Sequence, residues 1–185
     1  MGQKMEHDLE ITLALLTRTP AVLNALLRGL PEMWTEHNEG ENTWNARDVV
    51  AHLIHGENQN WISRAKLILE SGETRTFVPF DREGQVRYGR GKTLVQLLDE
   101  FTQARAAGLE DLRAMKLTRE DLNRRGRHPS LGAVTLSELL AAWAAHDLTH
   151  LHQITRVMAT QYRQAVGPWQ RFLGVLQCAG HSEPA

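Results

Sequence analysis

Apolar residues recur every three or four positions through four long segments of this 185-residue chain, a spacing typical of amphipathic α-helices. The first segment spans residues 6–30, with a break or second start at Pro20, and the second runs from about Ala46 to Leu69. The third runs from Thr93 to about Met115, and the fourth from Thr135 to about Tyr162. Because none of them alternates as a strand would, we expect an all-α four-helix bundle.

Start and stop signals fit these segments. Three pairs of residues have the spacing of a helix-capping box: Asn45 with Asp48, Thr93 with Gln96, and Thr135 with Glu138. Residues 72–92 contain several glycines and little periodicity, which predicts a long irregular connection between the second and third helices. Pro168 is placed to begin a short last helix through Leu176. We interpret residues 1–178 as a single domain and residues 179–185 as a loose C-terminal tail.

The chain is almost electrically balanced, with 21 basic and 22 acidic residues and a formal charge of −1. This balance provides no overall field to attract nucleic acid or an anionic membrane. The longest unbroken apolar run, residues 139–145, is far shorter than the roughly 20 residues of a membrane-spanning helix. Since the N-terminus has no signal-peptide pattern, we expect a cytoplasmic protein whose partner is a small molecule.

A metal bound by this chain would have to be held by histidine, aspartate or glutamate, and histidines are numerous. The chain has nine histidines but one cysteine, Cys178, which excludes an internal disulfide and a cysteine-rich zinc cluster. His146 and His150 are four residues apart and share the apolar face of the fourth helix, whereas His152 points the opposite way. Burying two imidazoles without partners costs about 1–3 kcal/mol per group. A divalent metal would satisfy both, and hydrogen bonds to neighbouring polar groups are the alternative.

The second helix offers a third ligand. His52 lies beside that helix's apolar stripe, on a flank that can turn toward a neighbouring helix, while His55 lies further round and is expected to be exposed. Three histidines leave one position open on a tetrahedral zinc ion, which is the arrangement of a reactive site. The candidate metal ligands are therefore His52, His146 and His150.

Three charged residues are unexpected on apolar stripes. Glu57 and Arg64 project from the stripe of the second helix, seven residues apart, so we expect each to meet a partner from another helix. Asp147 lies near the centre of the fourth stripe, as a candidate partner for Arg64 or for the second nitrogen of a ligand histidine. Glu57 and Asp147 are therefore candidates to support catalysis. A buried ion pair that fixes the helix register is the structural alternative.

These residues carry a family resemblance that extends over nearly the whole chain. Residues 44–53 with Glu57 and Trp61 resemble the second helix of the DinB/YfiT-like superfamily of metal-binding four-helix bundles. The fourth helix of that superfamily is matched by a second stretch of this chain. This stretch comprises residues 128–136, followed by Trp143, His146, Asp147, His150, Gln153 and Ile154. Residues 166–169 resemble the ending of one DinB-like subgroup. The combination of His52 with the two histidines of the fourth helix is the most specific part.

The resemblance implies that positions 52, 146 and 150 hold zinc or nickel. Characterised relatives are bacillithiol S-transferases and mycothiol-dependent maleylpyruvate isomerases, and homodimers have precedent in the family. We therefore expect a metal-dependent thiol S-transferase, or a thiol-dependent isomerase. A non-catalytic, stress-associated protein that binds metal or ligand is the alternative, and a metal-free structural bundle is a weaker third.

A low-molecular-weight thiol would have to supply the sulfur in such a reaction, because Cys178 lies close to the expected tail. Such thiols carry carboxylates, which arginines bind well. The candidates are Arg82, Arg87 and Arg90, with Lys92, in the long connection, or Arg124, Arg125 and Arg127 in the later loop. The alternative for both groups is a solvated basic loop.

Overall fold

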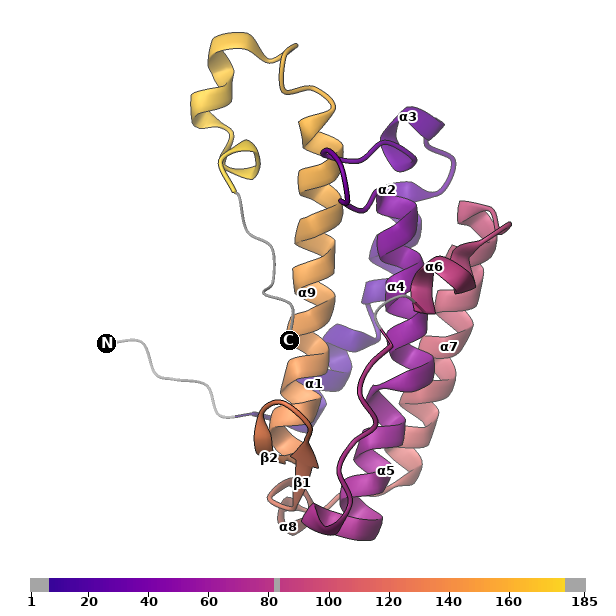
Figure 1. Ribbon diagram of the computed structural model, residues 1–185, viewed down its shortest axis with the longest axis vertical. Helices are drawn as coiled ribbons and strands as arrows, with labels where there is room; N and C mark the ends of the chain where they lie inside the picture. Colours follow the sequence, from indigo (N-terminus) through magenta and orange to yellow (C-terminus); the bar gives the residue numbers. More distant parts are fainter. Residues whose placement is uncertain (1–6, 82–83, 179–185) are drawn as a thin grey trace.

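The computed structural model describes residues 7–81 and 84–178, and it confirms the predicted four-helix bundle (Figure 1). The first helix of the bundle is divided into two short helices, α1 (Leu9–Leu16) and α2 (Thr19–Leu27), and the second is divided into α4 (Ala46–Gln59) and α5 (Trp61–Ser71). The third and fourth are single long helices, α7 (Leu94–Ala114) and α9 (Leu136–Thr160). α9 packs against α4, α5 and α1, and α7 packs against α4 and α2.

The predicted capping boxes are all formed. The Asn45 side chain accepts a hydrogen bond from the Asp48 backbone N–H at 2.8 Å, and the Asp48 carboxylate accepts one from the Asn45 N–H. Thr93 with Gln96 and Thr135 with Glu138 make the same reciprocal pairs at the starts of α7 and α9. These local bonds satisfy backbone donors that have no partner within a helix, so the sequence alone determines where three helices begin.

The prediction of one continuous helix over residues 46–69 is wrong, because the helix is interrupted at Asn60. This residue has φ −115° and ψ −65°, and its N–H still bonds to the Gly56 carbonyl at 3.0 Å. α5 therefore restarts at Trp61. The Trp61 indole stacks on Trp143 of α9, with ring centroids 5.8 Å apart.

A short hairpin follows α7, in a region where we expected an irregular break. After α8 (Arg119–Leu122), strand β1 (Arg125–His128) pairs antiparallel with β2 (Gly132–Thr135). Gly126 in β1 is required by close packing, because a Cβ there would lie 2.6 Å from Ile68 and 3.0 Å from Phe77. The hairpin also accepts a hydrogen bond from the Phe77 N–H at 2.9 Å through the Arg127 carbonyl. It thereby anchors the long connection against α5.

The predicted long connection between the second and third bundle helices is present, but it is partly ordered into helix. It contains η1 (Gly72–Thr74) and α6 (Gly84–Gly89), and α6 packs on α4. The remaining short elements are α3 (Glu32–Thr35), η2 (Gly167–Phe172) and η3 (Gly174–Leu176), the last two replacing the single short helix expected from Pro168. The expected tail, residues 179–185, lies outside the described residues.

The buried core forms two hydrophobic clusters, one at each end of the bundle. The first gathers around Leu16, Trp61, Leu109, Leu140 and Trp143. The second gathers around Leu23, Leu27, Leu53, Leu98, Phe101 and Ile154. In each of the four bundle helices, a polar residue lies between the part that contributes to the first cluster and the part that contributes to the second. These residues are Thr19, Glu57, Arg105 and Asp147, and they form a buried polar layer across the middle of the bundle.

One stretch of the described chain, Leu9–Leu27, is long and apolar enough to cross a membrane by length and composition alone, with a mean hydropathy of 1.2. A break at Thr17 and Arg18 divides it into α1 and α2, and 33 % of the window is buried inside the protein. Buried core helices pass the same test, so the finding is weak evidence for a membrane segment. The absence of a membrane partner stays a prediction.

Candidate metal centre

The three predicted histidines meet in the structure, on the α4–α9 contact. The Nε2 atom of His146 lies 3.2 Å from that of His52 and 3.1 Å from that of His150. Ligand nitrogens at about 2.0–2.1 Å from a tetrahedral zinc ion are roughly 3.3 Å from one another. The two printed spacings match this value, and the three ligand atoms all lie within 4.8 Å of one another, so the cluster could hold a single divalent ion.

The second ring nitrogen of each histidine determines which nitrogen carries the proton. The Nδ1 of His150 donates to the Gln153 Oε1 at 2.8 Å, because an amide oxygen only accepts. The lone pair of His150 is then on Nε2, facing the other two rings. The Nδ1 atoms of His52 and His146 are buried and have no hydrogen-bond partner among the described residues. Gln85 lies beside His52, and its Oε1 is likewise buried and unpaired among those residues.

All three imidazoles are neutral at ordinary pH. The pKa of His52 is lowered to about 3, mainly by burial and to a smaller extent by electrostatic repulsion from His150 and His55. Burial also lowers the pKa of His146 and that of His150. Neutral imidazole is the form that binds a metal, so no proton has to be displaced near pH 7.

Aromatic side chains surround the histidine cluster. Trp44 packs against His52 with ring centroids 4.8 Å apart, and it stacks over His150 at 6.4 Å. The Trp61 indole meets the His146 ring edge-on at 5.1 Å, and Phe80 from the long connection meets His52 at 5.7 Å. These apolar walls displace water, which strengthens the electrostatic effect of any charge in the site.

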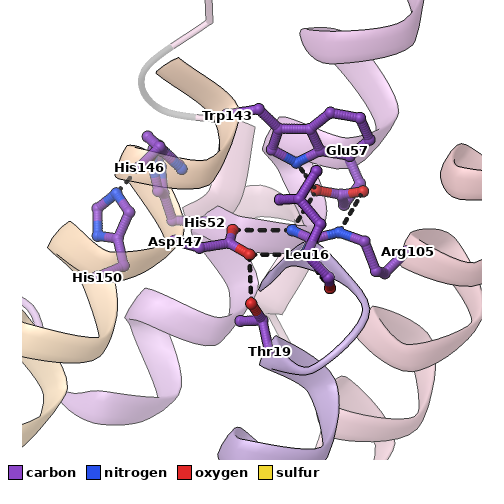
Figure 2. A network of polar contacts seen from close by, with 9 residues as sticks. All are labelled: Leu16, Thr19, His52, Glu57, Arg105, Trp143, His146, Asp147 and His150. Atoms are coloured by element: carbon purple, nitrogen blue, oxygen red, sulfur yellow. Dashed lines mark hydrogen bonds and ion pairs between the residues drawn. The ribbon is translucent and has the colours of Figure 1, made fainter. Parts of the chain in front are cut away.

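The buried polar layer lies beside the histidines and is organised by Arg105 (Figure 2). Its guanidinium donates to both Glu57 oxygens at 2.9 and 3.1 Å and to both Asp147 oxygens at 2.6 and 2.8 Å. Thr19 donates to Asp147 at 2.6 Å, and the Trp143 indole donates to Glu57 at 2.9 Å. Figure 2 shows Asp147 directed toward Arg105, away from the His150 ring. Consecutive residues on a helix differ by about 100°, which is why His146 and Asp147 face different groups.

The predicted partners of Glu57 and Asp147 can be compared with those in the structure. The expected partner of Glu57 on another helix exists and is Arg105, a residue that the sequence analysis missed. The suggested pairing of Asp147 with Arg64 or with a ligand histidine is wrong, because Asp147 binds Arg105 and Thr19. Both carboxylates therefore form the buried ion pair that was the structural alternative.

Arg64 also lacks the acidic partner that we expected. Its Nη2 donates to the Val78 backbone carbonyl at 3.3 Å, and its guanidinium lies over the Phe77 ring at 5.1 Å. Among the residues that the structure describes, no carboxylate forms an ion pair with it.

His55 is buried, contrary to expectation, with 8 % of its surface exposed. Its Nε2 bonds to the Asp81 carbonyl at 2.8 Å, and α6 covers it so closely that a Cβ at Gly84 would lie 2.2 Å from the ring. The long connection causes this burial, and helical periodicity gives no sign of it. His152 is exposed, as predicted.

The described arginines among those proposed to hold a thiol's carboxylates are all exposed, and this role stays a prediction. Arg82 lies outside the described residues, Arg87 is exposed and pairs with Asp81, and Arg90 is exposed. The second group is exposed as well, with Arg124, Arg125 and Arg127 lying on or next to the hairpin. Lys92 pairs with Glu100 at 2.7 Å.

Comparisons with known proteins agree with this fold and site. A family model described as the DinB superfamily matches residues 15–154, a range that contains all three histidines. A solved structure of YfiT from Bacillus subtilis is similar, with a TM-score of 0.71 and 21 % sequence identity. The match covers 89 % of this chain and 91 % of that one. YfiT is described as "a probable metal-dependent hydrolase with an unusual four-helix bundle topology".

No curated protein matches the chain in sequence. The family match nevertheless extends over well more than half of the residues and includes α4 and α9, which carry the histidines. This chain belongs to the DinB superfamily.

Proposed function

We propose that this protein is a metal-dependent thiol S-transferase in which His52, His146 and His150 hold one Zn²⁺ or Ni²⁺ ion. The observation that carries the proposal is the convergence of three neutral, largely buried imidazoles, with the Nε2 of His146 at 3.2 Å from that of His52 and 3.1 Å from that of His150. When bound, such an ion lowers the pKa of a neighbouring thiol, so that the thiol is a thiolate near neutral pH. Three uncharged ligands leave the full positive charge of the ion available for this effect.

The chain's own residues support this chemistry in distinct ways. Gln153 holds the His150 ring with its Nε2 toward the centre, so the ligand is oriented before any metal arrives. Trp44, Trp61 and Phe80 exclude water from the sides of the cluster. In the transfer, the thiolate sulfur forms a bond to carbon of an electrophile, the leaving group departs with its electron pair, and the thiol proton goes to solvent.

Hydrolysis is the second candidate, favoured by the description of YfiT. A hydrolase needs a group that accepts a proton from the attacking water. Glu57 and Asp147 are the nearby buried carboxylates, and Arg105 binds both oxygens of each. A free thiol has an ordinary pKa of about 8.5 and ionises far more easily than water, so thiol transfer needs no such base. This difference favours the S-transferase.

A non-catalytic role in binding metal or ligand would need the same histidines and is distinguished by turnover alone. We further propose a small-molecule substrate, a cytoplasmic location and a homodimer, with no nucleic acid or membrane partner. These proposals rest on the charge balance of the chain and on the family resemblance.

The metal site is tested first, by elemental analysis of protein purified without a histidine tag. We expect about one divalent ion per chain, a loss of that ion in His150→Ala, and unchanged content in His152→Ala, whose side chain is exposed on the same helix. Unchanged metal content in His150→Ala would contradict the ligand assignment.

Activity is tested next with the metal-loaded protein. Consumption of bacillithiol, mycothiol, glutathione and coenzyme A is followed with 1-chloro-2,4-dinitrobenzene as the electrophile, beside hydrolysis of p-nitrophenyl acetate. Metal-dependent thiol consumption supports the S-transferase, and ester hydrolysis without thiol consumption supports a hydrolase. Absence of both reactions would favour the binding role.

A further inference from the structure

Arg64 is a buried cation that forms no ion pair with a carboxylate of the described residues. Only 9 % of its surface is exposed, and its buried Nε–H has no hydrogen-bond acceptor among the described residues. The hydrogen bond that its side chain makes to a described residue, from Nη2 to the Val78 carbonyl, is long at 3.3 Å. Arg105, the other deeply buried arginine in this half of the bundle, is bound by two carboxylates. Burial of a charge is unfavourable unless a counter-charge meets it, so Arg64 lacks a ligand that its chemistry calls for.

The surroundings of Arg64 also favour an anion. His128, at the end of β1, packs edge-on against the same Phe77 ring that lies under the guanidinium. Its Nδ1 accepts the backbone N–H groups of Ser130 and Leu131 at 3.2 Å each, so the proton of the neutral ring is on Nε2. A second N–H donor therefore stands near the guanidinium. Burial lowers the pKa of Arg64, and the charge of Arg64 contributes to the lowered pKa of His128.

Two connections place Arg64 near the histidine cluster. Trp61, which contacts the His146 ring, lies three residues earlier on α5, about 4.5 Å along the helix axis. Phe80, which contacts the His52 ring, lies two residues after Val78, at most about 7 Å along an extended chain. With the contact distances and the Phe80 side chain added, the second connection allows a separation of up to roughly 20 Å between the guanidinium and the histidines.

We propose that Arg64 binds the carboxylate of the small molecule that reacts at the histidine site. The inference rests on the proposed function, because it concerns the ligand of that same site. A guanidinium binds a carboxylate through two parallel N–H donors, and the Nε–H of Arg64 is available as one of them. The substrate class is thus an anionic thiol or electrophile whose spacer is long enough to reach from Arg64 to the histidines.

The experiment compares two thiols that differ in charge. Isothermal titration calorimetry on zinc-loaded protein measures the affinities for 6-mercaptohexanoate and for the neutral 6-mercaptohexan-1-ol. We expect the wild type to bind the carboxylate about ten- to a hundredfold more tightly. Arg64→Met should remove this preference and leave the affinity for the neutral thiol unchanged. The matched control Arg75→Met, an exposed arginine in the connection that follows α5, should keep the preference.

Zinc content and circular dichroism report whether Arg64→Met is folded, and Arg64→Lys, which keeps the charge, should keep part of the preference. An equal affinity of the wild type for both thiols, or a preference that survives in Arg64→Met, overturns the proposal. If the carboxylate binds through Arg64 while the neutral thiol does not bind, the proposal for Arg64 stands and the thiol chemistry fails. If neither thiol binds, both fail.

Discussion

Replacing Arg105 with methionine tests the buried polar layer most directly. Methionine keeps a long, unbranched side chain but removes the cation between Glu57 and Asp147, whose side chains are 3 % and 0 % exposed. Both carboxylates, and the Leu16 carbonyl at 2.9 Å, would lose their guanidinium donors. Breaking a buried ion pair by removing one partner costs about 3–5 kcal/mol. We expect the free energy of unfolding to fall by that amount at pH 7.

The loss should depend on pH, with a sign set by Glu57. Burial raises the pKa of Glu57 above its ordinary value, while the charge and hydrogen bonds of Arg105 oppose that rise. Without Arg105, the pKa of Glu57 in the folded protein rises further above its value in the unfolded chain. The folded state then holds this proton more tightly, so stability decreases as pH rises through the raised pKa. The deficit of the variant should therefore be largest at pH 7 and smaller at pH 5.

Urea unfolding at pH 7 and pH 5 measures both effects, with the slope of the transition as a check on two-state behaviour. Arg113→Met on the exposed side of the same helix is the matched control and should change stability by less than about 0.5 kcal/mol. Adding Glu57→Gln to Arg105→Met should recover part of the loss. A loss below about 1 kcal/mol in Arg105→Met, or a deficit that grows at pH 5, would refute this account of the layer.

Two further predictions concern the histidines. Gln153→Leu removes the acceptor that orients His150 and should weaken zinc binding about 10- to 100-fold, measured by competition with a chromophoric chelator; exposed Gln164→Leu should leave the affinity unchanged. In the metal-free folded protein, the pKa of His52 is about 3, whereas in the unfolded chain it is about 6.5. As pH falls below about 6.5, His52 therefore gains a proton in the unfolded chain and stays neutral in the folded protein. His52 should therefore contribute about 2 kcal/mol to a loss of stability between pH 6.5 and pH 5. Urea unfolding of wild type and His52→Gln checks this, and an identical pH dependence in both would contradict it.

Local signals predicted the helices well, and contacts distant in sequence account for the differences. Capping boxes are made within four residues, so the starts of α4, α7 and α9 could be read from the chain. The strands of the hairpin have only four residues each, too few for a periodic pattern. Their packing depends on Gly126 against Ile68 and Phe77, which are far away in the chain.

The candidate site was predictable for a similar reason. Two of its histidines share a helix face, and the third lies at the edge of a stripe, so periodicity finds them all. Arg105 was missed although a signal existed. It falls in a gap of the α7 stripe, four residues from Phe101 and four from Leu109, so it shares their face. The pairing of Arg105 with both carboxylates requires the relative placement of three helices, which periodicity does not provide.

The histidine cluster and the polar layer have different electrostatic roles. The histidines provide neutral ligands for a metal, and the layer provides a negative charge close to it. Arg105 binds Glu57 and Asp147, so neither carboxylate competes for a metal, and the ligand set is left with imidazoles alone. With both carboxylates ionised, the layer carries one net negative charge beside a site that is neutral without metal. Burial lowers the pKa of His150, and the Gln153 hydrogen bond and the charge of Asp147 oppose this shift, so the field of Asp147 acts on the cluster. The layer can therefore stabilise a bound cation from behind without neutralising it through direct ligation, which keeps the ion's charge for a thiol.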